Sequence, residues 1–132
     1  MRRIVPAIVV CLAAIVLLAD DQDATRKKIE AKQRAVDADQ AAKRVDLADW
    51  CANKGLIQEA RAEYDKAISL VGGNQKWERD RENLKFRERR KNKNQPDDAE
   101  DRAAYDKSKK KLAEAYAKLY AELAAQAREA EL

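Results

Sequence analysis

The sequence predicts an all-α protein, and three observations lead to that fold class. Charged residues make up 39% of the 132-residue chain, whereas aromatic residues make up 5%. The chain contains only 3 glycines and 2 prolines, so few residues in it end helices. Apolar residues recur every three or four positions, as they do along one face of a helix. This composition is typical of long, solvated helices, and the length permits one domain with a modest core.

Residues 1–19 are expected to form a signal peptide or a membrane anchor. Arg2 and Arg3 precede an apolar run from Ile4 to Ala19, and Asp20 follows it. A run of roughly 16 residues reaches about 24 Å as a helix, short of the ~30 Å bilayer core, which favours a cleaved signal. If residues 4–19 are retained, they anchor the chain with its body outside the cytoplasm. We therefore expect an exported protein, periplasmic or secreted, or membrane-anchored with its body extracytoplasmic.

Cysteine usage fits an exported chain without an internal disulfide. Cys11 leaves with a cleaved signal, and Cys51 then remains alone. A buried small hydrophobic residue is favoured for Cys51 over an intermolecular bridge or a reactive thiol, because free cysteines are usually buried.

The mature region is expected to begin with a long helix from Asp23 or Thr25 to Lys54. Its first part, residues 20–40, has few branched aliphatic residues among many charges, which predicts a charged helical stalk. Gly55 supplies the left-handed position that ends a helix, and Leu56 can make the apolar contact that accompanies such an end.

A second helix is expected from Ile57 to Val71, ended by Gly72 and Gly73. Apolar residues repeat along it at spacings of three and four, which makes one face apolar. Together with the preceding helix it forms an antiparallel hairpin over residues 41–74. Its inner faces are predicted to pair Leu47, Ala48 and Cys51 with Ala60, Tyr64 and Ala67.

This hairpin resembles one tetratricopeptide repeat, a helix–turn–helix unit of about 34 residues. The positions that match the family pattern are Leu47, Ala48, Gly55, Ala60, Tyr64 and Ala67, whereas Arg44, Cys51 and Gly72 depart from it. An ordinary αα-hairpin is the alternative interpretation. A single repeat cannot bury its apolar face alone, so either the rest of the chain or a partner must cover it.

The resemblance also implies a function, because repeats of this family bind other proteins. Their ligands commonly lie along the concave face formed by each first helix. In this chain that face corresponds to Val45, Asp49, Ala52 and Asn53. Asp49 would repel a terminal carboxylate, so a carboxylate ligand is not favoured.

The last part of the chain is expected to contain a basic helix over residues 75–95 and an amphipathic helix over residues 97–132. Cations outnumber acids in the basic helix, which could bind phosphates, although ion pairing at a helix end is favoured. Trp77 and Phe86 are interpreted as core contacts. In the last helix, Asp97 with Glu100 resembles a capping box, and an apolar stripe favours packing on the hairpin over a coiled coil. This stripe comprises Tyr105, Leu112, Tyr116, Leu119, Leu123 and Ala130.

The sequence predicts no enzyme, no cofactor and no metal site. The chain contains no histidine, and its pattern shows no phosphate loop, no nucleophile elbow and no spaced set of metal ligands. Another protein, presented as a peptide or helix, is the expected partner, with a second copy of the chain as an alternative. A membrane-anchored coiled-coil subunit and a basic-surface binder of nucleic acid or acidic polymer are the other functional hypotheses, and nucleic acid is disfavoured for an exported chain.

Overall fold

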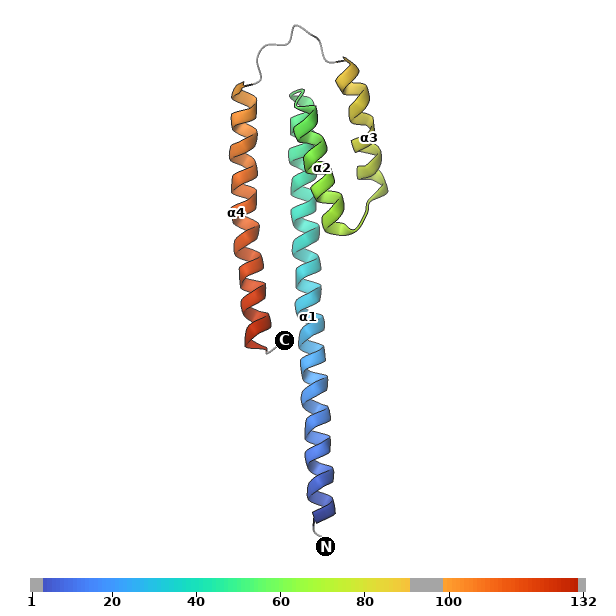
Figure 1. The fold of residues 1–132 in the computed structure, drawn as a ribbon, viewed down its shortest axis with the longest axis vertical. Helices are drawn as coiled ribbons and strands as arrows, with labels where there is room; N and C mark the ends of the chain where they lie inside the picture. The colour runs from blue at the N-terminus through green and yellow to red at the C-terminus, as the bar shows by residue number, and fades with distance from the viewer. Residues whose placement is uncertain (1–3, 91–98, 131–132) are drawn as a thin grey trace. The chain divides into compact units, whose positions relative to one another are not determined.

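The computed structural model describes the backbone of residues 4–90 and 99–130, and side chains within 21–87 and 99–130. The described residues form four α-helices and no strand (Figure 1). The helices are α1 (Ile4–Asn53), α2 (Ile57–Val71), α3 (Gln75–Arg90) and α4 (Ala99–Glu129). The prediction of an all-α fold is therefore confirmed.

Helix α1 begins earlier than the sequence pattern suggested, at Ile4 rather than at Asp23 or Thr25. Pro6 lies in its first turn, where a missing backbone N–H costs little, and no glycine precedes Gly55. The side chains of residues 1–20 lie outside those described, so the signal peptide or anchor at residues 1–19 stays a prediction. Among the described residues, no helix is both long and apolar enough to cross a membrane.

The chain divides into two compact units, one formed by Met1–Gln33 with Tyr120–Leu132 and the other by Arg34–Leu119. In the first unit, Lys32 on α1 donates a hydrogen bond of 3.3 Å to Gln126 on α4. Most described side chains of this unit are exposed, and Ile29 and Leu123 are half-buried. The unit is therefore held by partial burial and polar contacts, as expected for solvated helices.

The second unit contains the hairpin, and its turns form as the sequence predicts. Gly55 adopts φ 80°. The backbone N–H of Leu56 donates to the carbonyl of Cys51 at 2.8 Å, and the backbone N–H of Gly55 donates to the carbonyl of Ala52 at 3.1 Å. This pair of bonds is the Schellman motif, which satisfies the last carbonyl groups of α1. Leu56 is buried at the turn.

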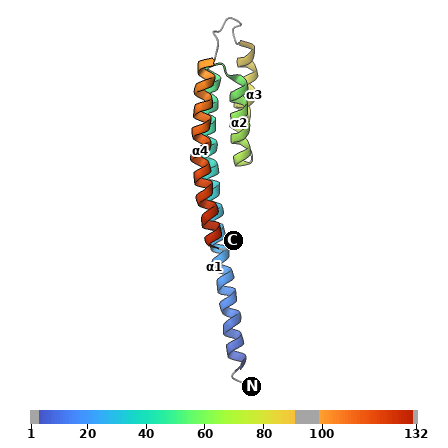
Figure 2. The same cartoon turned by 60° about the vertical axis from the view of Figure 1, so that its left-hand side comes forward.

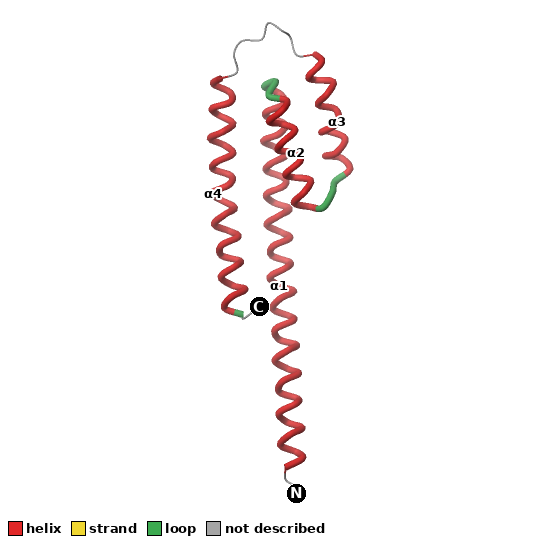
Figure 3. The backbone as a smooth tube through the Cα atoms, viewed as in Figure 1, coloured by secondary structure: helices red, strands yellow, loops and turns green. Residues whose placement is uncertain are grey.

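Helix α2 ends at a second left-handed glycine, Gly72, with φ 74°. Asn74 then begins α3, because its side-chain oxygen accepts a hydrogen bond of 3.1 Å from the amide of Trp77. Figure 3 shows the two short connections at either end of α2. Both are too short for the helices to separate, so α1, α2 and α3 fold back on one another within this unit.

The core of the second unit is made largely of small residues. Ala41, Ala48, Cys51, Ala60 and Ala67 are all 0% exposed. Small side chains on facing helices allow the backbones to approach closely. Larger residues complete the core at its ends and edges: Val45, Leu56, Ile57, Tyr64, Leu84 and Tyr105.

Helix α4 contributes Tyr105 to this core. Tyr105 and Tyr116 are buried, Leu112 is half-buried and Leu119 is 38% exposed. Within this unit, the part of α4 before residue 120 runs antiparallel to the part of α1 after residue 33 (Figures 1 and 2). Lys109 lies on the same face as Tyr105 and Tyr116, and its ammonium nitrogen is 5.8 Å from the ring centre of Tyr105. The predicted stripe is thus buried mainly at its two tyrosines.

The prediction for Phe86 is wrong, because this side chain is 48% exposed. Trp77 and Leu84 of the same helix pack on the core, as expected for residues seven positions apart. Phe86 is two positions beyond Leu84, about 200° around the helix, and therefore faces away from the core. The ammonium nitrogen of Lys85 lies 5.4 Å from the centre of its ring.

Candidate functional site

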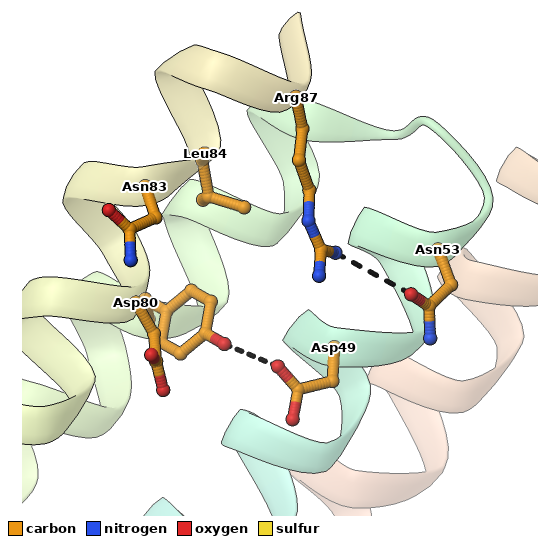
Figure 4. Close-up of a pocket in the computed structure, with 7 residues that line it drawn as sticks. Asp49, Asn53, Asp80, Asn83, Leu84 and Arg87 are labelled. Atoms are coloured by element: carbon orange, nitrogen blue, oxygen red, sulfur yellow. Dashed lines mark hydrogen bonds between the residues drawn. The ribbon is translucent and has the colours of Figure 1, made fainter. Parts of the chain in front are cut away.

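A polar pocket of ≈ 360 Å³ lies where the end of α1 meets α2 and α3, within the second unit. Four of its residues come from α3, two from α1 and one from α2. They are Asp49, Asn53, Tyr64, Asp80, Asn83, Leu84 and Arg87 (Figure 4). Six of the seven side chains carry a polar or charged group, so the pocket is suited to hydrogen bonding and charge recognition rather than to an apolar ligand.

Asp49 and Tyr64 join α1 to α2 at one wall of the pocket. The Tyr64 hydroxyl donates a hydrogen bond to the Asp49 carboxylate. Burial raises the pKa of Tyr64, and the hydrogen bond to Asp49 and the negative charges of Asp49 and Asp80 raise it further. Tyr64 therefore stays a neutral donor and holds the carboxylate of Asp49 at the pocket.

Arg87 and Asn53 form a second polar contact, between α3 and the end of α1. The guanidinium of Arg87 donates to the side-chain oxygen of Asn53 at 3.5 Å, as Figure 4 shows. This is a long hydrogen bond and therefore a weak one. The nearby Leu84 is 2% exposed and gives the pocket an apolar base.

Asp80 has a weak partner outside the pocket, on its own helix. The ammonium of Lys76 lies 3.2 Å from its carboxylate, one helical turn earlier. The Lys76 side chain is 74% exposed, so this pair is a weak, solvent-screened contact.

The structure separates the four residues predicted to form a partner-binding face. Asp49 and Asn53 are exposed and line the pocket, whereas Val45 and Ala52 are buried, 7% and 6% exposed. Val45 and Ala52 are seven positions apart and share the core-facing stripe of α1 with Ala48, so they cannot also face solvent.

The residues that match the repeat pattern occupy the interior of the hairpin. Ala48, Ala60, Tyr64 and Ala67 are buried, and Leu47 is half-buried against the core. Together with the left-handed Gly55, they lie where an αα-hairpin needs small or interlocking side chains.

Asp80, Asn83 and Arg87 were missed because they lie in a segment interpreted as a basic block. Their spacing of three and four residues is the available signal, since it places all three on one face of a helix. Several described cations of this block also lie close to acids. Arg81 pairs with Asp65 of α2 at 2.7 Å, and Lys85 pairs with Glu82 at 3.4 Å.

A buried polar cluster, also missed, lies on another part of the same unit. Glu63 is 0% exposed and accepts hydrogen bonds of 2.8 Å from Arg44 and 2.7 Å from the Tyr105 hydroxyl. The ammonium of Lys66 is 3.6 Å from the same carboxylate, and burial lowers the pKa of Lys66. Arg44 is one of the residues that depart from the repeat pattern, and its side chain forms this ion pair.

Cys51 is buried beside this cluster, and the structure confirms its prediction as a small buried residue. Burial raises its pKa from 9.0 to about 12, and the charges of Glu63 and Glu59 add to the shift. The thiol is therefore protonated and inert at neutral pH.

Within the described residues, no group of three or more histidines, cysteines or acids is arranged to hold a metal ion. The pocket offers hydrogen-bond donors, acceptors and charges, which suit recognition of another molecule. No family model matches the chain, and no curated protein or solved structure matches it either.

Proposed function

We propose that the chain is an exported protein–protein interaction module, whose hairpin at residues 41–74 acts like a single tetratricopeptide repeat. The pocket formed by α1, α2 and α3 is where a peptide or helix of the partner docks. The observation that supports this most strongly is that Asp49 and Asn53, two residues of the expected ligand face, line this pocket together with α3.

The packing of the hairpin leaves its polar surface available for binding. The apolar faces of α1 and α2 are covered by Leu84 of α3 and Tyr105 of α4, so the hairpin does not need a partner for its core. The surface that remains is polar and concave. Such a surface can bind a segment of another protein without unfolding the module.

Site-specific photo-crosslinking in the native cells tests this proposal. A photoreactive amino acid replaces Asn83, which is exposed and lines the pocket. The matched control places the same group at Ser108, which is exposed on α4. A discrete crosslinked partner is expected from position 83 and not from position 108. Equal products from both positions, or none from either, would refute the proposal.

Intact mass and fractionation test the export part of the proposal. We expect a chain that begins near Asp20 in an extracytoplasmic soluble fraction. A full-length chain in the membrane fraction would show instead that residues 1–19 are an anchor, and a full-length chain in the cytoplasm would refute export.

A further inference from the structure

Two carboxylates and one guanidinium line the pocket, which leaves one negative charge in excess. We propose that the pocket binds a cationic side chain, the ammonium of a lysine or the guanidinium of an arginine, presented by the partner's peptide. This inference rests on the proposed function and names the chemistry that the pocket selects.

Asp49 supplies the first acceptor for the cation. One of its carboxylate oxygens accepts the Tyr64 hydroxyl, and no other partner of Asp49 occurs among the described residues. A carboxylate has about four lone-pair sites, so Asp49 can accept further hydrogen bonds from a ligand. The hydroxyl of Tyr64 fixes the orientation of this carboxylate before the ligand arrives.

Asp80 supplies the second acceptor. Both Asp49 and Asp80 raise the pKa of Tyr64, because both negative charges lie close to the same hydroxyl. Lys76 pairs with Asp80 only at an exposed position, and an exposed pair of this kind contributes little free energy. A ligand cation can therefore replace Lys76 at small cost.

Arg87 offsets only one of these two acids: its guanidinium also lies near the Tyr64 hydroxyl, where its positive charge lowers the pKa of Tyr64. Its guanidinium donates to the Asn53 side-chain oxygen at 3.5 Å and, within the part of the chain that the structure describes, forms no ion pair with Asp49 or Asp80. Arg87 and the amide groups of Asn53 and Asn83 are instead suited to the peptide carbonyl and amide groups beside the cationic side chain.

The size of the pocket fits one long side chain of the docked segment. Its volume of ≈ 360 Å³ lies at the lower end of the ~300–1,000 Å³ typical of small-ligand sites. Leu84 at its base can contact the aliphatic part of a lysine or arginine side chain, while the charged end meets the two carboxylates.

The test is an NMR titration of the full-length ¹⁵N-labelled chain with N-acetyl-lysine-N′-methylamide. The side-chain amide signals of Asn53 and Asn83 report on the pocket itself. Saturable shifts of these signals are expected with the lysine probe. The norleucine analogue, which lacks the charge, and the glutamate analogue, which reverses it, are expected to bind at least about tenfold more weakly.

Two variants separate the role of Asp80 from that of overall charge. Asp80→Asn is expected to weaken lysine binding by about tenfold or more, because it removes one charge-assisted contact. Glu78→Gln removes the same charge from another part of α3 and is expected to leave binding within about twofold. Urea unfolding of each variant verifies that the fold is intact.

Equal binding of the three probes, preference for glutamate, or an unchanged affinity in Asp80→Asn would overturn the inference. These failures differ from failure of the proposed function. A partner crosslinked at position 83 with no lysine selectivity would refute only the cation preference. A selective lysine site with no crosslinked partner would refute the proposed function.

Discussion

Tyr105 donates a hydrogen bond of 2.7 Å to Glu63, 42 positions earlier in the chain, and so joins α4 to α2 at a carboxylate that is 0% exposed. Arg44 of α1 donates to the same carboxylate at 2.8 Å. Three helices therefore meet at one buried charge. A buried charge without its partner is strongly destabilising, so this cluster makes the assembly of the three helices interdependent.

Replacement of Glu63 by alanine should lower the free energy of unfolding by about 3–5 kcal/mol, because it leaves the guanidinium of Arg44 buried without its partner. Urea unfolding followed by circular dichroism measures the change. The double variant Arg44→Met with Glu63→Leu should lose less stability than Glu63→Ala alone. Asp46→Ala, at an exposed position of α1, is the control and should stay within about 0.5 kcal/mol. A Glu63→Ala chain as stable as this control would contradict the role of the cluster.

Tyr105→Phe should cost about 1.5–3 kcal/mol, because it removes a hydrogen bond to a buried charged group and keeps the ring. Tyr116→Phe should cost less. Tyr116 donates to Asp39, which is exposed and can bond to water instead. Thermal unfolding of the two variants under the same conditions shows which substitution costs more stability. The reverse order would mean that the α4 contact with α2 is not the stronger of the two.

Alkaline pH should destabilise the fold from about pH 9 upward. Burial raises the pKa of Cys51 from 9.0 and that of Tyr116 from 10.0, each to about 12, and burial also raises the pKa values of Tyr64 and Tyr105. Above pH 9 the unfolded chain loses these protons while the folded chain keeps them, so stability falls as pH rises to about 12.

Urea unfolding at a series of pH values measures this loss, and absorbance of tyrosinate follows the titration directly. Tyr105→Phe removes one of the titrating groups and should make the decline shallower. Stability that is constant between pH 9 and 12 would mean that these groups titrate alike in the folded and unfolded chains.

The thiol of Cys51 should resist modification in the folded chain. A Cys11→Ser variant leaves Cys51 as its single thiol. Because Cys51 is 0% exposed and its pKa is raised, its reaction with a disulfide reagent at pH 8 should be at least about a hundredfold slower than in urea. Equal rates would show that the hairpin opens freely.

The hairpin could be predicted from the sequence because its signals are local. Gly55 ends one helix, Gly72 ends the next, and the small residues Ala60 and Ala67 repeat at helical spacing between them. Each of these signals depends only on residues within one or two helical turns of one another. The fold class and the inner faces of the hairpin follow from them.

The candidate site and the buried cluster could not be predicted in the same way. Glu63 has the pattern of an exposed acid, and its burial depends on Arg44 and Tyr105 from two other helices. Asp80 and Arg87 likewise reach the pocket only because α3 folds back against the end of α1. The spacing of Asp80 and Arg87 places them on one face of α3, but it does not say which distant helix that face meets.

The small residues of the core have a consequence for the register of the hairpin. Ala48 of α1 is small and fully buried, and the small residues Ala60 and Ala67 of α2 are seven positions apart. A slip of α2 along α1 by two turns would therefore bring small side chains together again. Shape alone discriminates poorly against such a slip. Such a slip would separate the buried carboxylate of Glu63 from the guanidinium of Arg44, which is strongly destabilising. The ion pair between Arg44 and Glu63 therefore favours the native register of the hairpin, because only this register keeps the two charges together.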